Sequence, residues 1–597
     1  AETIVYNALD QRTQTQFHDG STINEEFDAL GRLISRTDQD NKVMSYEYDG
    51  LGRLTAVVDA LNQRTEFEYD EAGNKTVQRD ANLNETTWTY DALGRVLSRA
   101  LPLGQMESFT YDANGNQLTR TDFNGDTTTF EYDVNDRLVK VTYDDLSEEG
   151  FTYDAVGNRL TATDASGTIS YSYDVRNRLT LETKPDGSTI AYDYDNAGNR
   201  TVVTTTVQTN TTPITLIDTH TYDGLNRLAT STDSGFNTTT YGYDDVGNRA
   251  SILHPNGNTT QYTYDALNRL IDISVFDATS ALVDQFVYTL HATGRREVIT
   301  ELGGRVSTYT YDDLYRLTSE DITDAVNGNY DASYVYDAVG NRTSSTINGA
   351  TTSYSYDDND RLTSAGGDSY SYDANGNTVS KTEGGVTTTN VYDDRNRLVS
   401  STTGGVTTSY SYDVDGMRTG RSSGGSSTSF ITDNNRDYTQ VVAEVTDGVF
   451  EKGYSFGDDL VSQVFPGGSV FFYHYDGLGS TRSLSDNTGT FTDEYDYEAF
   501  GELTGSSGAT DNDYLFAGEQ FDDGLGEYYL RARYYDQGIG RFTQMDTFQG
   551  VQNDPVTLHK YLYANVDPVN GIDPSGNVTL AELNAAGTIN RVLTTVS

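Results

Sequence analysis

The stretch VMSYEYDGLGRLTAVVDALNQR, residues 43–64, contains every part of the unit from which most of the chain is built. Tyr46 and Tyr48 are two residues apart, so both rings lie on one face of a β-strand. Asp49 then opens a turn, and Gly52 occupies a position that suits a positive φ angle. The residues that follow, RLTAVV, predict a second strand. The stretch therefore predicts a β-hairpin.

Tyr-Asp recurs every 21 residues through six consecutive units, and with slips the pattern continues as far as Tyr412. Four residues after each of seventeen tyrosines stand ten Gly, four Asn, two Asp and one Tyr, which is Tyr315. Gly, Asn and Asp tolerate a positive φ angle, so we predict a left-handed backbone at this position in nearly every unit. The seventeen are Tyr48, Tyr69, Tyr90, Tyr111, Tyr132, Tyr153, Tyr173, Tyr194, Tyr222, Tyr243, Tyr264, Tyr311, Tyr336, Tyr356, Tyr372, Tyr392 and Tyr412.

Such a hairpin is too small to fold alone, but hairpins stacked edge to edge form one continuous sheet. There is room for roughly twenty units, and open sheets rarely stay flat beyond about ten strands. The predicted fold is therefore all-β: stacked hairpins curled into a spiral or a hollow cocoon shell. Residues 201–221 and 271–310 interrupt the register and are interpreted as variation in loop length.

The strict pattern fades near residue 430. This change predicts three parts: a hairpin array over residues 1–430, a non-repeating segment over 431–577, and a short C-terminal tail over 578–597. In the tail, Thr579 could cap a helix over residues 580–586.

Composition excludes several classes of function. The 40 basic and 90 acidic side chains give a net charge of −50, which disfavours binding to nucleic acid. The chain has no Cys, so disulfides, thiol catalysis and cysteine-bound zinc are excluded. No apolar run is long enough to predict a transmembrane helix. The sequence begins Ala1-Glu2-Thr3 without a signal-peptide pattern, so a signal has been removed or the chain is part of a longer protein.

The hairpin unit resembles the YD repeat of RHS proteins, insecticidal toxin-complex shells and teneurins. The strings Phe516 to Asp522, Tyr528 to Asp536 and Gly540 to Phe542 resemble the RHS-repeat-associated core. The string YYLRARYYD within them is highly specific. Its motif residues are Tyr528, Tyr529, Arg531, Arg533, Tyr534, Tyr535 and Asp536, followed by Arg541.

This resemblance implies a hollow β-cocoon that encloses its own C-terminal segment as cargo, often a toxin. It also implies an intramolecular aspartyl protease, with Asp546 and Asp573 as the carboxylates and the bond between Asn577 and Val578 as the cleavage site. A close pair of carboxylates supports such chemistry because one retains a proton while the other activates water. A purely structural role for both is the alternative.

The chain departs from the family pattern near this site. Met545 replaces the usual Arg, Asn577 replaces the usual Leu, and only twenty residues follow, too few for a toxin enzyme. On the residues alone, both replacements should weaken cleavage and favour an intact or slowly cut chain.

Three functions remain open on this reading. They are an encapsulating shell that releases a toxin, a secreted or cell-surface scaffold, and a glycan-binding adhesin whose tyrosines stack on sugars. We favour a structural shell or scaffold, with no metabolic enzyme activity and no cofactor. No metal site is predicted, because the Asp112-x-Asn114-x-Asn116 stretch has Phe123 where a calcium loop needs Glu.

Overall fold

The computed structural model describes residues 2–581, and its main feature is a single antiparallel sheet of 48 strands. The sheet runs from β1 (Thr3–Tyr6) to β48 (Leu503–Ser507), and each strand pairs with the next one in the chain. The described residues contain no α-helix and three short 3₁₀ segments: η1 (Phe516–Gly518), η2 (Pro555–Leu558) and η3 (Ala564–Val566). The predicted all-β repeat fold is confirmed. No helix in this part of the chain has the length and apolar character needed to cross a membrane.

The predicted hairpin is formed by β5 (Val43–Tyr48) and β6 (Leu54–Val58). In the turn between them, the Asp49 carboxylate accepts hydrogen bonds from the backbone N–H groups of Leu51 and Arg53, each 2.9 Å long. Gly52 has a φ angle of 86°. The φ angle is positive at all seventeen equivalent positions, and even Tyr315 adopts a value of 65°. The conformational prediction is therefore confirmed throughout the array.

Neighbouring hairpins are joined by the repeated tyrosine and arginine. The Tyr69 hydroxyl, at the end of β7 (Arg64–Tyr69), donates a 2.7 Å hydrogen bond to the Leu54 carbonyl of the preceding hairpin. Arg53 contacts Asp49 in its own turn at 2.6 Å and donates to the Asp70 carbonyl of the next turn at 2.7 Å. Its guanidinium also lies 4.9 Å from the centre of the Tyr69 ring. These tyrosines therefore pack hairpin against hairpin.

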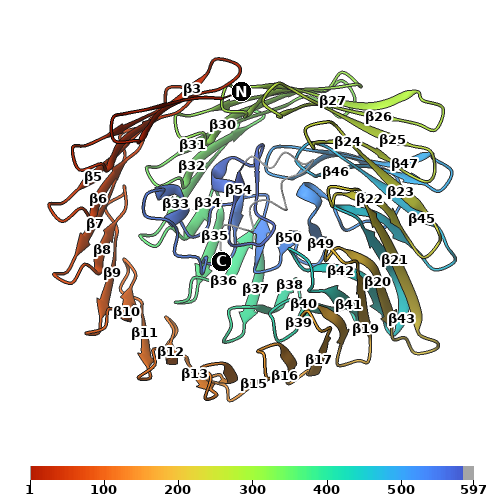
Figure 1. Cartoon of the computed structure of the whole chain (residues 1–597), viewed down its shortest axis with the longest axis horizontal. Helices are drawn as coiled ribbons and strands as arrows, with labels where there is room; N and C mark the ends of the chain where they lie inside the picture. The colour runs from red at the N-terminus through yellow and green to blue at the C-terminus, as the bar shows by residue number, and fades with distance from the viewer. Residues whose placement is uncertain (1, 582–597) are drawn as a thin grey trace.

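The long sheet curls into a spiral of about two turns, visible in Figure 1 as a ring of strands. Arg269 lies 3.9 Å from Asp19, which shows where the chain comes back beside its own beginning. We call residues 2–264 the first turn and residues 265–507 the second turn. The contact between them, which we call the seam, includes ion pairs of Arg159 with Asp415 at 2.6 Å and Arg249 with Asp459 at 2.5 Å.

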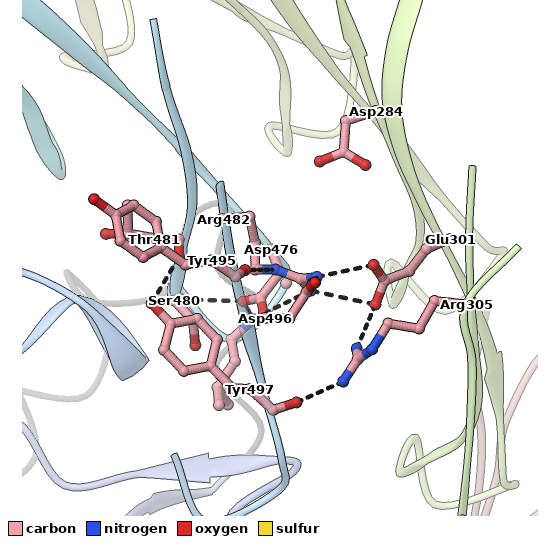
Figure 2. Close-up of polar contacts among 12 residues, drawn as sticks. Asp284, Glu301, Arg305, Asp476, Ser480, Thr481, Arg482, Tyr495, Asp496 and Tyr497 are labelled. Carbon is pink, nitrogen blue, oxygen red and sulfur yellow. Dashed lines mark hydrogen bonds and ion pairs between the residues drawn. The ribbon is translucent and has the colours of Figure 1, made fainter. Parts of the chain in front are cut away.

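Within the second turn, buried charges tie its beginning to its end (Figure 2). Arg482, on β46 (Thr481–Asp486), contacts Glu301 at the end of β28 (Arg296–Glu301) at 2.8 Å. Glu301 also contacts Arg305 at 2.7 Å, and Arg305 donates to the Tyr497 carbonyl at 2.7 Å. Because each arginine is paired, the cluster can be buried without an isolated charge.

The two irregular stretches differ from the prediction in one respect. Residues 201–221 lengthen the strands themselves, giving β20 (Arg200–Val207) and β21 (Ile214–Tyr222). Residues 271–310 likewise form strands, including β26 (Leu270–Phe276) and β27 (Leu282–Leu290). Burial alternates along the extra residues of β20, where Val203, Thr205 and Val207 are buried, a pattern typical of a half-buried strand.

The part of the non-repeating segment that follows the large sheet lies inside the ring in Figure 1. It forms a second, four-stranded sheet of β49 (Gln520–Asp522), β50 (Glu527–Leu530), β51 (Arg533–Asp536) and β52 (Arg541–Phe542). We call residues 516–577 the core segment. The predicted boundary at residue 430 stays a prediction, because β41 (Ser426–Asp433) crosses it within the large sheet.

The helix predicted over residues 580–586 is wrong at its start. Leu580–Ala581 forms β54, which pairs with β53 (Gly571–Ile572). A strand forms there instead of a helix because β53 supplies hydrogen-bond partners for the backbone groups of residues 580 and 581. Residues 582–586 lie outside the described part of the chain.

Candidate functional site

The candidate site begins at the tight turn between β50 and β51. Leu530 pairs with Arg533, so Arg531 and Ala532 form a two-residue hairpin turn, and Arg531 has a positive φ angle of 62°. This turn points Arg531 and Arg533 toward the end of the core segment. Arg531 contacts Glu519 at 2.7 Å and also donates to the Pro574 carbonyl.

Arg533 is the centre of the site. Its Nη2 lies 3.0 Å from the Asp546 carboxylate and 3.5 Å from that of Asp573, so one guanidinium nitrogen contacts both predicted carboxylates. Its Nε donates to the Gly576 carbonyl, and its Nη1 donates to the Lys560 carbonyl at 3.0 Å. The side chain is 4% exposed. The structure thus brings Asp546 and Asp573 together around a buried cation.

Asp573 reaches the predicted cleavage site directly. Its Oδ1 accepts hydrogen bonds from the backbone N–H groups of Asn577 and Val578, each 3.1 Å long, and from the Ser575 hydroxyl at 3.0 Å. The turn depends on Gly576, which has a φ angle of 72°. A Cβ there would lie 2.3 Å from the Leu530 carbonyl oxygen. The chain at residues 577–578 is therefore held against a carboxylate by its own backbone.

Asp546 approaches from the loop after β52. Its Oδ1 accepts a 2.7 Å hydrogen bond from the Phe548 N–H, and its own N–H donates to the Lys560 carbonyl at 2.9 Å. Met545 stands where the family pattern has an arginine, and the cation that contacts both carboxylates in this chain is Arg533. The expected weakening of cleavage by the loss of an arginine at position 545 stays a prediction.

Burial raises the pKa of both Asp546 and Asp573, and the Arg533 guanidinium opposes that rise. Burial lowers the pKa of the nearby Lys560 amine to about 7. A raised carboxyl pKa favours the protonated form, which acid–base chemistry requires of one of the two carboxyls.

A cavity borders this region. A cavity of about 710 Å³ lies between the first turn, the second turn and the core segment. Tyr46 and Trp88 line it from the first turn, Tyr315 from the second, and Met545 and Lys560 from the core segment. Met545 precedes Asp546 in the chain, and the Lys560 carbonyl accepts the hydrogen bond from the Asp546 N–H.

The remaining motif residues attach the core segment to the shell. Tyr528 and Tyr535 donate to the carbonyls of Gly501 and Phe500 at 3.1 and 2.7 Å. The other contacts are Tyr529 Oη with the Arg418 N–H, Tyr534 Oη with Arg418 and with the Tyr412 hydroxyl, Asp536 with Lys381, and Arg541 with Asn341 and the Asp360 carbonyl.

Comparison with known protein families agrees with this architecture. The profile described as Teneurin YD-shell matches residues 293–569, and the profile described as RHS Repeat matches nine segments between residues 27 and 279. The chain belongs to the RHS/YD-repeat family. The resemblance inferred from its motifs is confirmed.

Solved structures of RHS-type shells share the fold. The TcdB2-TccC3 crystal structure superposes with a TM-score of 0.81 at 17% identity, covering 96% of this chain and 34% of that one. The Tc holotoxin pore of Photorhabdus luminescens, carrying a TccC3-D651A mutation, gives a TM-score of 0.78 at 16% identity, with 96% and 33% coverage. At this identity the likeness concerns the shell fold.

Curated RHS relatives match over short segments. The tRNA nuclease WapA of Bacillus subtilis is 36% identical over 138 residues, which is 22% of this chain and 6% of WapA. The double-stranded DNA deaminase toxin A of Burkholderia cenocepacia is 30% identical over 116 residues, or 18% of this chain and 8% of the toxin. The aligned part thus spans less than a tenth of these two relatives.

Some site residues were not predicted as such. Arg533 was named as a motif residue without a role, and no role was predicted for Ser575 or Lys560. Ser575 has a sequence signal, since it stands two residues after Asp573 in a turn-forming string, whereas Lys560 has none. In the part of the chain that the structure describes, no group of three or more His, Asp or Glu side chains could hold a metal ion. Asp112 instead caps its own turn through the N–H groups of Asn114 and Asn116.

Proposed function

We propose that this chain is an encapsulating shell that holds its own C-terminal segment and cuts it free after Asn577. The observation that carries the proposal is the hydrogen bond from the Val578 N–H to the Asp573 carboxylate, because Val578 supplies the leaving nitrogen of that bond. The segment enters as β54, which lies inside the ring in Figure 1. A secreted or cell-surface location is part of the same proposal.

In the proposed reaction, water attacks the Asn577 carbonyl carbon, and Asp546 accepts the proton that the water loses. Protonated Asp573 gives its proton to the Val578 nitrogen as the C–N bond breaks. The immediate products are a carboxylic acid at Asn577 and an amine at Val578, and the proton of the acid then passes to the amine, giving a carboxylate and an ammonium group, so atoms and protons balance. Burial favours the protonated form of Asp573 before the reaction, and Arg533 favours the ionised form after it.

Intact-mass spectrometry tests the proposal. Freshly purified protein should contain a fragment that ends at Asn577, and Asp573→Asn or Asp546→Asn should leave the chain whole. Asp554→Asn is the matched control, because burial also raises the pKa of that carboxyl, but it does not contact Arg533 in the structure. Control protein should be cut like the wild type. An uncut wild-type chain, or a cut Asp573→Asn chain, would count against self-cleavage.

A scaffold that stays intact is the second candidate function. The observation in its favour is Asn577, which replaces the apolar residue of the family pattern and is partly exposed beside the scissile bond. Asn577→Leu separates the two. A wild-type chain that stays whole while Asn577→Leu is cut would indicate a shell that has lost efficient cleavage.

A further inference from the structure

One part of the seam joins the end of the first turn to the end of the second. The loop between β24 (Arg249–Leu253) and β25 (Thr259–Tyr264) packs on β46 and on the loop after it. Asn256 donates to the Ser485 hydroxyl at 3.0 Å and to the Asp486 carbonyl at 2.8 Å. Asn258 donates to the Gly489 carbonyl at 3.1 Å. These bonds hold the two turns together only while the loop stays in place.

Two histidines meet inside this contact. His254 begins the loop, and His474 lies on β45 (Val470–Tyr475); they are 4% and 2% exposed. Their ring centres are 5.0 Å apart, edge to face. Phe472 lies 5.4 Å from His254, and Phe491 lies 4.8 Å from His474. Aromatic rings therefore surround most of the pair.

The histidine pair has few polar partners. His474 Nε2 bonds with the Ser485 hydroxyl at 2.9 Å. The Nδ1 atoms of both rings are buried without a hydrogen-bond partner in the described part of the chain. Such an environment accepts a neutral imidazole and strongly disfavours a charged one.

The charged groups on the surrounding strands are engaged elsewhere. Asp486 caps its own turn through the Thr488 and Thr490 N–H groups, and Asp493, on β47 (Phe491–Tyr497), accepts from the Thr510 N–H. The others are Asp272 with Gln285, Arg249 with Asp459, and Arg482 with Glu301, while Glu494 is exposed. No ion pair joins a carboxylate to either imidazole among the described residues.

We propose that His254 and His474 form an acid-sensitive latch, which keeps the two turns together near neutral pH and releases this part of the seam in acid. The latch is a feature of the shell itself and does not depend on self-cleavage.

The protonation states of the two histidines decide whether acid opens or closes the latch. Burial lowers the pKa of His254 to about 4, and burial together with the nearby His254 lowers the pKa of His474 well below its ordinary value. In the opened state both return toward about 6.5. The opened state therefore binds more protons, and its population relative to the closed state rises as pH falls from 6.5 toward 4. Each histidine favours opening about tenfold for each pH unit in that window.

Buried carboxyls elsewhere act in the opposite direction. Burial raises the pKa of Asp218 and of Asp360 to about 7, so these groups favour the closed shell as pH falls. Global unfolding would mix both effects. The measurement must therefore report on the latch region alone.

Hydrogen–deuterium exchange of the full chain, followed by mass spectrometry, gives that resolution. The opening equilibrium of peptides from β24–β25 and β45–β46, corrected for the intrinsic pH dependence of exchange, should rise at least about 100-fold from pH 6.5 to 4.5. In the double variant H254Q/H474Q, neutral at all pH values, the rise should be less than tenfold. The matched control is His18→Gln, which removes an exposed histidine in the first turn and should behave like the wild type.

If the double variant does not fold, His254→Phe serves instead, because Phe472 already packs at that ring, and it should show a rise about ten times smaller than the wild type. A wild-type opening equilibrium that is flat between pH 6.5 and 4.5 would overturn the proposal. So would an H254Q/H474Q or His254→Phe chain that opens with the wild-type pH dependence.

Discussion

The hairpin array and the core segment use the same chemical pair, an arginine and a carboxylate, in opposite surroundings. In the array, the side chains of Arg53 and Asp49 are 26% and 22% exposed. Where the array meets the core segment, those of Arg418 and Asp522 are 1% and 0% exposed, with their charged atoms 2.6 Å apart. The array thus repeats a weak contact many times, whereas the core segment depends on a few contacts that cannot be exchanged for water.

The largest effect should come from the buried pair. Arg418→Met removes the buried cation that pairs with Asp522 and leaves only the partly exposed Arg421 near that carboxylate, so we expect a loss of about 3–5 kcal/mol in the free energy of unfolding. Urea unfolding followed by tyrosine fluorescence measures it. Arg421→Met is the matched control, since Arg421 lies 3.6 Å from the same carboxylate but is 30% exposed. Equal losses in the two variants would show that burial does not decide the strength of these pairs.

The array was predictable from sequence because each of its contacts is local. Tyr, Asp and the residue four positions after Tyr recur in register, and turn chemistry fixes the backbone there without help from distant residues. Tyr315 shows that this also holds for an unfavourable residue, since it adopts a φ angle of 65° in the same kind of turn. The Arg53 link to the next turn was not predicted, although its partner Asp70 stands at a fixed distance along the chain.

The candidate site was predictable only through the family motif. Asp546 and Asp573 are two among 90 acidic residues, and no spacing rule brings them to one guanidinium. Their meeting depends on the turn at Arg531 and on how the core segment packs inside the second turn. The helix prediction at Leu580 failed for the same reason: Leu580 pairs with Ile572, and only the tertiary structure brings these two residues together.

A smaller effect should come from the turn glycine. In Gly52→Ala an alanine must adopt the left-handed backbone conformation of Gly52, where φ is 86°. We expect the free energy of unfolding to fall by about 1–2 kcal/mol. Gly50→Ala, two residues earlier in the same turn, is the control: its φ angle is not positive, and no atom lies within 4 Å of the added Cβ. Thermal unfolding of both variants checks the difference. A Gly50→Ala chain that is as unstable as Gly52→Ala would argue against backbone conformation as the cause.

The repeated tyrosine hydroxyl should contribute less again. Tyr111→Phe removes the 2.9 Å hydrogen bond to the Val96 carbonyl of the preceding hairpin but keeps the ring. We expect a loss of about 0.5–1.5 kcal/mol, the usual net contribution of one hydrogen bond. Tyr6→Phe, at a side chain that is 56% exposed on the first strand, should change the melting temperature much less. No measurable loss in Tyr111→Phe would mean that the ring alone joins the hairpins.

The smallest effect, and the sharpest test of the comparison, is Arg53→Met. Exposed ion pairs contribute about 0–1 kcal/mol and are screened by salt, so we expect a small loss that shrinks further between low and molar sodium chloride. The stacking of Arg53 on Tyr69 should leave a residual loss at high salt, since a ring contact is less sensitive to ionic strength than an ion pair. The Arg418→Met loss should stay nearly constant over the same salt range, because solvent ions do not reach that pair. Urea unfolding of both variants at two salt concentrations measures this, and equal salt dependence would mean that array and core segment do not differ in screening.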